Sequence, residues 1–287
     1  MNQTHHNFDQ ETKGWVDLIH PREPRSELTT QIDTKWLVIG AGFTGLSCAR
    51  RLAELNPTEK IVLLEAREVG QSASGRNSGY AVAHSHFSGG YQKNQLEHYQ
   101  RIDRINQTGL TSLKSIIEAN QIDCDYKDAG IYHMAADKNS SGECDQFVDY
   151  LQKRKIEHVE LSKDQIKLEL GTSWYQKGVK VKKGALVQPA KLVFGLADSL
   201  PNNVELYENT PVMELTRGVI NTIQTPKSSV KADNVIMACN YEPLANGKHK
   251  QRVVGVTLSG SITRVLNQNE VDLLGTESSW GILSLHS

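Results

Sequence analysis

The chain has 287 residues, with 32 lysines and arginines against 33 aspartates and glutamates and a formal net charge of -1, which argues against a generally basic nucleic-acid-binding protein. Its hydrophobic fraction of 38% and charged fraction of 23% are typical of globular proteins and exclude a largely disordered chain. No apolar run approaches the roughly 18 residues that cross a bilayer, so a membrane-spanning protein is excluded as well.

Residues 1–34 are polar and contain Pro21 and Pro24, which predicts an extended N-terminal arm. The first residues lack the charged start and apolar stretch of a secretory signal. The four cysteines lie far apart without a C-x-x-C pair, which argues against a zinc site or a disulfide framework and favours a reducing compartment. We therefore expect a cytoplasmic protein without a bound metal.

The first regular elements are predicted from Trp36 onward. Residues 36–39 form a short apolar run of the buried-strand type, and a glycine turn follows at 40–45. Apolar residues at helical spacing continue to Pro57, which ends the helix, and a second apolar run at 61–64 ends in Glu65. Strand, turn, helix and strand form a βαβ unit, so we expect an α/β fold with a Rossmann-like domain.

Residues 66–95 contain five glycines and no helical pattern where a simple doubly wound fold would continue with a helix. Such a stretch inside a compact domain is typically functional or disordered. Residues 96–117 then predict a long amphipathic helix, in which Gly109 is a weak point. Further helices are predicted at 147–155, 163–170 and 190–200, and strands at 130–134, 204–207, 212–215, 234–238, 253–266 and 280–285.

The glycine turn has the pattern Gly40-x-Gly42-x-x-Gly45, which is a weak signal alone but here lies between a strand and a helix. In such turns the first glycine permits the tight turn, the second lets the backbone approach a diphosphate, and the third allows close helix–strand packing. The helix start at Thr44 presents free N–H groups and a partial positive charge to the phosphates.

Glu65 follows Gly45 by 20 residues, at the end of the next strand. A carboxylate there accepts hydrogen bonds from ribose hydroxyls and repels a 2′-phosphate. The alternative is a glycine turn beside a solvated acid. We favour an adenine dinucleotide site, to which the neighbours Phe43 and Ala66 are also assigned.

The segment Ala73-Ser74-Gly75-Arg76-Asn77-Ser78-Gly79 favours FAD over a nicotinamide cofactor. Its small residues let the backbone pass close to a flat ligand. Arg76 can neutralise diphosphate oxygens, and Ser74, Asn77 and Ser78 offer hydrogen-bond donors. The alternative for Arg76 is a solvated loop arginine.

Residues 36–79 resemble the FAD-dependent oxidoreductase family of D-amino-acid, glycine and sarcosine oxidases, and most of all its gamma-glutamylputrescine oxidase-like branch, which has the same glycine pattern followed by Ala-Ser-Gly-Arg-Asn. The resemblance continues more weakly at 184–192, 210–212 and 232–238. It implies that Val212 contacts adenine through its backbone and that the strand ending at Ala238 passes under the cofactor.

The resemblance implies oxidation of a C–N bond in a small amine or amino acid, with hydride transfer to flavin N5 and hydrolysis of the resulting imine. No catalytic residue is predicted. His84 and His86 could line the flavin or substrate face, but we favour two loop histidines that point partly to water.

Together these observations predict an N-terminal arm at 1–34, an FAD-binding domain at 35–90 and 184–245, and an interleaved α+β substrate domain at 91–183 and 246–287. Members of the family usually continue beyond the equivalent of Ser287, so the substrate domain is expected to be incomplete. Two alternatives to an active flavoenzyme stay open: a non-catalytic nucleotide-binding remnant or subunit that needs a partner chain, and a nicotinamide-dependent dehydrogenase, which the stretch after Glu65 disfavours.

Overall fold

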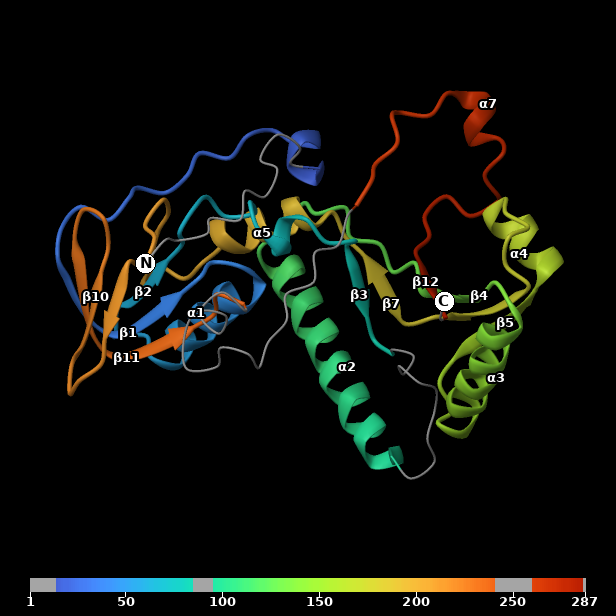
Figure 1. Cartoon of the computed structure of the whole chain (residues 1–287), viewed down its shortest axis with the longest axis horizontal. Coiled ribbons are helices and arrows are strands. Elements are labelled where there is room, and N and C mark those ends of the chain that lie inside the picture. The colour runs from blue at the N-terminus through green and yellow to red at the C-terminus, as the bar shows by residue number, and fades with distance from the viewer. Residues whose placement is uncertain (1–13, 85–94, 241–259, 286–287) are drawn as a thin grey trace. The chain divides into compact units, whose positions relative to one another are not determined.

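A computed structural model of the chain describes residues 14–84, 95–240 and 260–285 (Figure 1). Two compact units are formed by segments that are far apart in the sequence. One contains the described parts of 1–77 and 189–262, and the other those of 78–188 and 263–287. The predicted α/β class, with a Rossmann-like part interleaved with an α+β part, is confirmed.

The first unit is built on a six-stranded sheet in the order β8-β2-β1-β11-β10-β9. Its first four strands run parallel, and β10 and β9 follow antiparallel at one edge. The strands are β1 (Ile32–Ile39), β2 (Ile61–Leu64), β8 (Val204–Tyr207), β9 (Glu214–Thr216), β10 (Asn221–Gln224) and β11 (Ser229–Met237).

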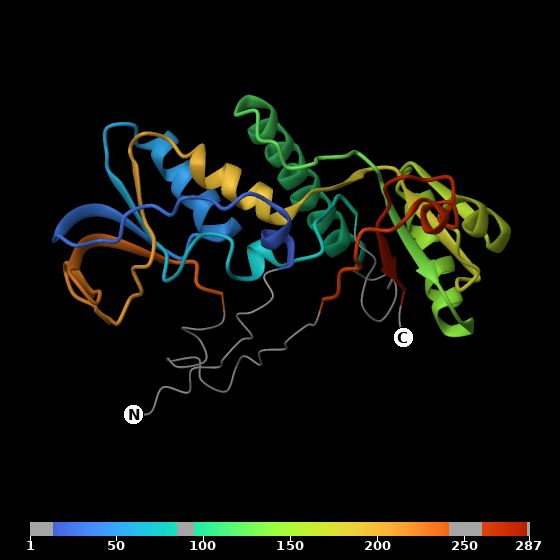
Figure 2. The same ribbon diagram turned by 90° about the horizontal axis from the view of Figure 1, so that it is seen from above.

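The apolar runs 36–39 of β1 and 61–64 of β2 lie inside the sheet, and all four residues of β2 are buried. Leu37 and Ile39 pack into a cluster that also contains Leu28 from the segment before β1. Val38, which points to the opposite face, is fully buried. The helices α1 (Phe43–Leu55) and α5 (Pro189–Asp198) of this unit lie side by side (Figure 2). Two short 3-10 helices, η1 (Gly14–Leu18) and η2 (Ala73–Gly75), complete it.

The second unit contains a four-stranded sheet in the order β12-β4-β6-β5 and a separate antiparallel pair, β3 with β7. Only the β12–β4 pairing is parallel. The strands are β3 (Tyr80–Val82), β4 (Ile131–Ala135), β5 (His158–Ser162), β6 (Lys177–Val181), β7 (Gly184–Leu186) and β12 (Ile282–Ser284). The helices are α2 (Leu96–Ala119), α3 (Lys138–Lys153), α4 (Lys163–Leu170) and α7 (Gln268–Val271).

Several predicted elements differ from the structure. Two strands begin earlier than predicted: β1 at Ile32, within the predicted arm, and β11 at Ser229. The helix predicted at 147–155 already begins at Lys138, because Asp137 and Ser140 form a reciprocal capping box. The strand predicted at 212–215 begins only at Glu214. The strand predicted at 253–266 is wrong for 260–266, an extended stretch whose first six residues are exposed and which has no strand partner in the described chain, while 253–259 lie outside the described residues.

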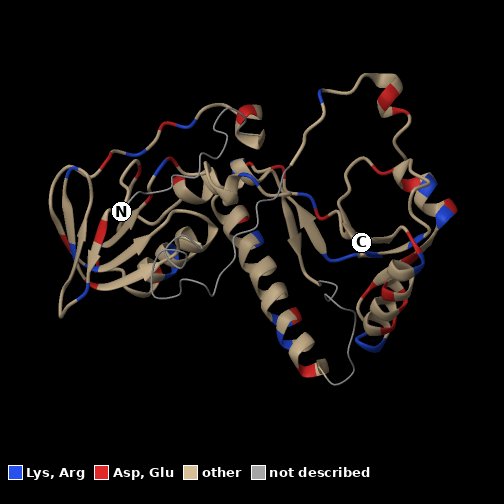
Figure 3. Ribbon diagram, viewed as in Figure 1, with Lys and Arg blue, Asp and Glu red and all other residues tan. Residues whose placement is uncertain are grey.

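The helices α2, α3 and α4 each carry both acidic and basic residues (Figure 3). The lysines of β6 and the residues after it form ion pairs at its surface: Lys177 with Asp145 and Lys182 with Glu157. Charge is therefore distributed in opposite-sign pairs rather than in a field of one sign. Within the described ranges, no helix combines the length and the apolar sequence needed to cross a membrane.

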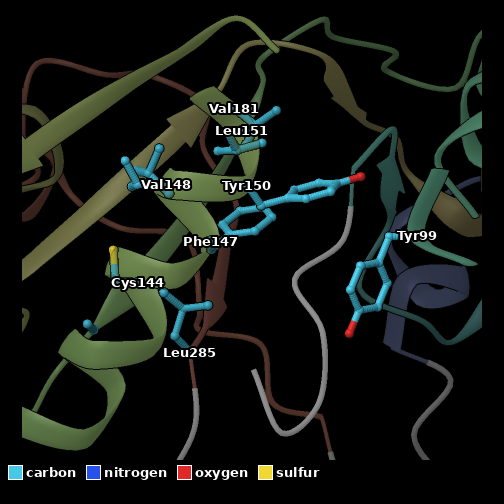
Figure 4. Close-up of a cluster of buried hydrophobic side chains, with 10 residues drawn as sticks. Tyr99, Cys144, Phe147, Val148, Tyr150, Leu151, Val181 and Leu285 are labelled. Carbon is cyan, nitrogen blue, oxygen red and sulfur yellow. The ribbon is translucent and has the colours of Figure 1, made fainter. Parts of the chain in front are cut away.

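A polar network is buried at one edge of the second unit's core. Tyr150 of α3 stacks over Phe147 with a ring distance of 6.5 Å, and its hydroxyl points away from that ring (Figure 4). The hydroxyl donates to Asp103 of α2, and the other carboxylate oxygen of Asp103 lies 3.1 Å from Nδ1 of His84. All three side chains are at most 3% exposed. Burial, followed by the Asp103 contact, raises the pKa of Tyr150 far above its ordinary range, so the phenol stays protonated as a donor.

Replacing Tyr150 with phenylalanine should lower the free energy of unfolding by about 1–3 kcal/mol, because a buried carboxylate oxygen loses its donor. Tyr126→Phe is the matched control, since it also removes a tyrosine hydroxyl that donates to an aspartate, Asp128, but at an exposed site. The control should change stability by less than about 0.5 kcal/mol. Denaturant unfolding followed by circular dichroism measures both free energies. An equal loss of stability in the two variants would show that burial does not increase the contribution of the Tyr150 hydrogen bond.

Candidate dinucleotide-binding site

The chain leaves β1 in a turn that only glycine can form at its first position. Gly40 has φ +98°, and its N–H donates to the carbonyl of Leu64 at 2.7 Å. At the third position, a Cβ on Gly45 would lie 1.7 Å from the carbonyl oxygen of Gly40. The helix α1 therefore begins in direct contact with the end of the strand, as the glycine pattern predicted. Ala238, at the end of β11, also lies against this turn, since its carbonyl oxygen would be 2.7 Å from a Cβ on Gly40.

Gly42 is the N-cap of α1 and makes no side-chain cap for the helix. The hydroxyl of Ser74 instead accepts a hydrogen bond from Phe43 N at 3.0 Å, and a Cβ on Gly42 would meet this hydroxyl at 2.8 Å. Thr44, in the first turn, is exposed. The helix start thus combines bare backbone, a hydroxyl group and the positive end of the helix dipole, which is the chemistry that binds a phosphate.

Glu65 turns its carboxylate toward the glycine turn. One oxygen accepts from Ala41 N at 2.8 Å and the other from Arg67 N at 3.1 Å. Burial raises the pKa of this carboxyl above its ordinary value, and the two backbone N–H groups oppose that rise. A half-buried carboxylate fixed beside the helix start is suited to accept hydrogen bonds from ribose hydroxyls.

The polar side chains of the loop after Glu65 differ in whether they are hydrogen-bonded within the loop or exposed without an ion pair to a described residue. Ala66 is exposed, and the exposed side chain of Arg76 forms no ion pair with any residue in the described ranges. The Asn77 amide donates to the carbonyls of Ala73 and Ser74 at 3.2 and 2.9 Å, and so it holds the η2 turn in shape. Of these residues, Arg76 has the charge available for an anionic ligand.

Of the remaining predicted residues, Val212 belongs to the first unit, and Ser78 and His84 belong to the second. Val212 packs into the apolar cluster of the sheet, two residues beyond Thr210, whose N–H donates to the Glu65 carbonyl at 2.8 Å. Ser78 is exposed and begins the second unit. The interpretation of His84 as partly solvated is wrong: it is 2% exposed and lies against Asp103. His86 lies outside the described residues.

Sequence reasoning missed two residues that shape the site, Arg22 and Glu208. Arg22 lies in the predicted arm, and its guanidinium contacts the Glu208 carboxylate 186 residues away. Their separation leaves no local pattern that could pair them. The one available signal is that Glu208, like Glu65, directly follows an apolar strand, and β8 and β2 are neighbours in the sheet.

The glycine turn, the helix start and the Glu65 carboxylate meet at the carboxyl edge of adjacent parallel strands, where nucleotides bind in open α/β sheets. The hydroxyl of Ser74 lies where a Cβ on Gly42 would point, so the Gly42 backbone and this hydroxyl together form the start of the helix. Arg76 adds a positive charge nearby in the sequence. These residues fit the diphosphate and ribose of an adenine dinucleotide.

Comparison with known proteins agrees with this geometry. A family model described as FAD dependent oxidoreductase matches residues 35–276. Gamma-glutamylputrescine oxidoreductase of Escherichia coli (strain K12) is 28% identical over 220 residues, which cover 76% of this chain and 51% of that protein. The chain therefore spans about half the length of this relative.

Solved structures share the fold. Glycine oxidase from Geobacillus kaustophilus superposes with a TM-score of 0.59 at 18% identity, covering 72% of this chain and 55% of that one. L-amino acid deaminase from Proteus vulgaris gives a TM-score of 0.58 at 17% identity, with 77% of this chain and 49% of that one covered.

Replacing Gly45 with alanine should destabilise the protein by about 1–3 kcal/mol, because the new methyl group overlaps the Gly40 carbonyl and the backbone has to shift. Gly109→Ala is the control. Gly109 is exposed inside α2, and a Cβ there meets no described atom within 4 Å, so this change should stabilise by about 0.5–1 kcal/mol. Opposite signs in chemical unfolding are expected; a stabilising Gly45→Ala would contradict the close contact.

Proposed function

The chain belongs to the FAD dependent oxidoreductase family, and on this premise we propose that it binds FAD at the glycine turn and oxidises a C–N bond of a small amine or amino acid. The observation that carries the proposal is the Glu65 carboxylate, held at the turn by Ala41 N at 2.8 Å beside the start of α1. A dinucleotide needs both groups at once: a carboxylate for ribose and free N–H groups for the diphosphate.

Different residues of the first unit would bind different parts of the cofactor. Backbone N–H groups at the start of α1 and the Ser74 hydroxyl hold the diphosphate, and Glu65 holds the ribose. Arg76 adds positive charge from its exposed position. Val212 and Ala238 belong to the adenine and flavin sides of the same site. When bound, FAD would supply the hydride-accepting chemistry, and the protein orients it and excludes water.

The substrate class follows from what the relatives are named for. Gamma-glutamylputrescine, glycine and L-amino acids all carry an amine on the carbon skeleton that is oxidised or deaminated. We assign substrate binding to the second unit, whose mostly antiparallel sheet is typical of an α+β domain. We also propose a reducing, cytoplasmic location, because the four cysteines lie far apart in the sequence without a C-x-x-C pair.

The absorbance spectrum of the purified full chain, with its cofactor identified by mass, tests the proposal. We expect a flavin spectrum, FAD as the released cofactor, and reduction of oxygen or an artificial acceptor when a panel of amines and amino acids is added. Bound flavin without turnover would indicate a nucleotide-binding chain that lacks catalysis by itself. Binding of NADH in place of flavin would contradict the proposal.

FAD affinity should depend on the ionisation of Glu65. Because the pKa of this buried carboxyl lies above its ordinary value of 4.5, affinity should begin to fall at a higher pH than an ordinary glutamate would give as the solution is acidified. Glu65→Gln should weaken binding by about tenfold or more, since a hydrogen bond to a charged group contributes about 1.5–3 kcal/mol, and should flatten the pH profile. Fluorescence titration with FAD measures both effects.

Glu59→Gln is the control, because Glu59 is an exposed acid of the same unit that pairs with Lys35 at 3.0 Å.

The Glu65 contribution to the stability of the unliganded protein should change with pH in the opposite direction from FAD affinity. A carboxyl whose folded pKa exceeds its unfolded pKa stabilises the unliganded protein at low pH, and this contribution is lost as the pH rises through the folded pKa. A Glu65 variant with unchanged affinity at every pH would contradict the assignment.

A further inference from the structure

Glu65 has a buried counterpart on the neighbouring strand. In the pairing of β2 with β8, Leu64 lies opposite Tyr207, so Glu65 and Glu208 follow at the same level of the sheet. Glu208 is 0% exposed. Two carboxylates at adjacent strand ends repel each other, and the Glu208 charge contributes to the raised pKa of Glu65. The pair therefore needs compensation from nearby positive charge.

Arg22 supplies this charge to Glu208. Its Nη1 donates to both carboxylate oxygens, at 2.9 and 2.7 Å, and its side chain is only 9% exposed. Nε of the same guanidinium donates to Asp198 at the end of α5 at 3.0 Å, and the group lies 6.0 Å from the ring centre of Phe194. Because the guanidinium is fixed on several sides, it holds Glu208 in one orientation.

Glu208 in turn fixes the loop that carries the cofactor-binding groups. One of its oxygens accepts from Val69 N at 2.7 Å. The same loop is joined to the end of β8 by two further hydrogen bonds, from Asn209 N to the Arg67 carbonyl and from Thr210 N to the Glu65 carbonyl. Residues 208–210 are thus hydrogen-bonded to residues 65, 67 and 69 of this loop.

The contacts continue from this loop to the start of α1. Gly70 follows Val69 and packs on Phe194, and a Cβ on Gly75 would lie 2.0 Å from the Gly70 carbonyl oxygen. Ser74, beside Gly75, accepts from Phe43 N. All of these residues belong to the first unit.

We infer that Arg22 is a positioning residue for the FAD site: by neutralising and orienting Glu208, it fixes the loop that places Glu65 and Ser74 at the glycine turn. This inference rests on the proposed function. It assigns part of the cofactor site to the segment before β1, which touches neither the glycine turn nor the Glu65 carboxylate through any described hydrogen bond.

The test measures the FAD dissociation constant of the full chain for the wild type, Arg22→Ala, Arg22→Lys and Arg25→Ala. Arg25 is the matched control because its exposed guanidinium lies 3.6 Å from the same Asp198, while only its backbone N–H contacts Glu208. The folded fraction of each variant is measured by circular dichroism at the titration temperature. We expect at least tenfold weaker binding for Arg22→Ala, an intermediate value for Arg22→Lys and less than a twofold change for Arg25→Ala.

The pH profile separates positioning from a general loss of structure. Without Arg22, the uncompensated charge of Glu208 should move the acid limb of FAD binding to higher pH, because Glu208 and Arg67 are the charged groups that act on Glu65. A merely structural role would weaken binding by the same factor at every pH. Arg22→Ala combined with Glu208→Gln removes the unpaired charge and should return the limb toward the wild-type pH.

The outcomes are distinguishable. If the wild type does not bind FAD, the proposed function fails and the inference with it. If the wild type binds and Arg22→Ala binds within twofold of it, or weakens equally at all pH values, only the inference is overturned. Should Arg22→Ala not fold, Arg22→Lys decides, because lysine keeps the charge but loses the planar guanidinium contacts: a folded variant with a dissociation constant several-fold above the wild-type value supports the inference, and the wild-type value contradicts it.

Discussion

Two carboxylates buried at the ends of adjacent parallel strands are the constraint on which the rest of this site depends. Glu65 and Glu208 follow β2 and β8 at the same level. A buried carboxylate is costly unless it is paired or accepts hydrogen bonds. The two are treated differently: Glu208 is fully buried and receives a guanidinium and two backbone N–H groups, whereas Glu65 is only half-buried and receives two backbone N–H groups.

Because of this difference, Glu208 serves the structure of the unit, whereas Glu65 is available to bind a ligand. The Glu208 charge is neutralised inside the unit by Arg22. Glu65 keeps a raised pKa and a position at the glycine turn, which is an unfavourable state for an unliganded protein and a useful one for binding ribose hydroxyls. A partly buried carboxylate that costs stability is expected at a functional site, where packing elsewhere in the protein compensates for the cost.

The second unit shows the same rule in another form. Asp103 is a buried residue of α2, and its two oxygens face the Tyr150 hydroxyl and the His84 ring. The carboxylate is accommodated because side chains from two other segments, Tyr150 of α3 and His84 after β3, contact it. His84 follows the β3 strand, so this network ties the end of β3 to both α2 and α3. Whatever the second unit binds, its helices are held by polar contacts in addition to the apolar cluster.

The sequence by itself determined the local features of this protein. Periodicity and glycine spacing predicted α1, β2, α4 and β8 closely, and the second half of β1, because each depends on neighbours along the chain. The glycine turn and the Glu65 position followed from the same local pattern. Only the tertiary structure decided what is buried: His84 reads as a loop residue until α2 covers it, and residues 260–266 alternate like a strand but have no partner in the described chain. The Arg22–Glu208 pair joins residues 186 positions apart, and no local pattern encodes which distant strand end a cation will meet.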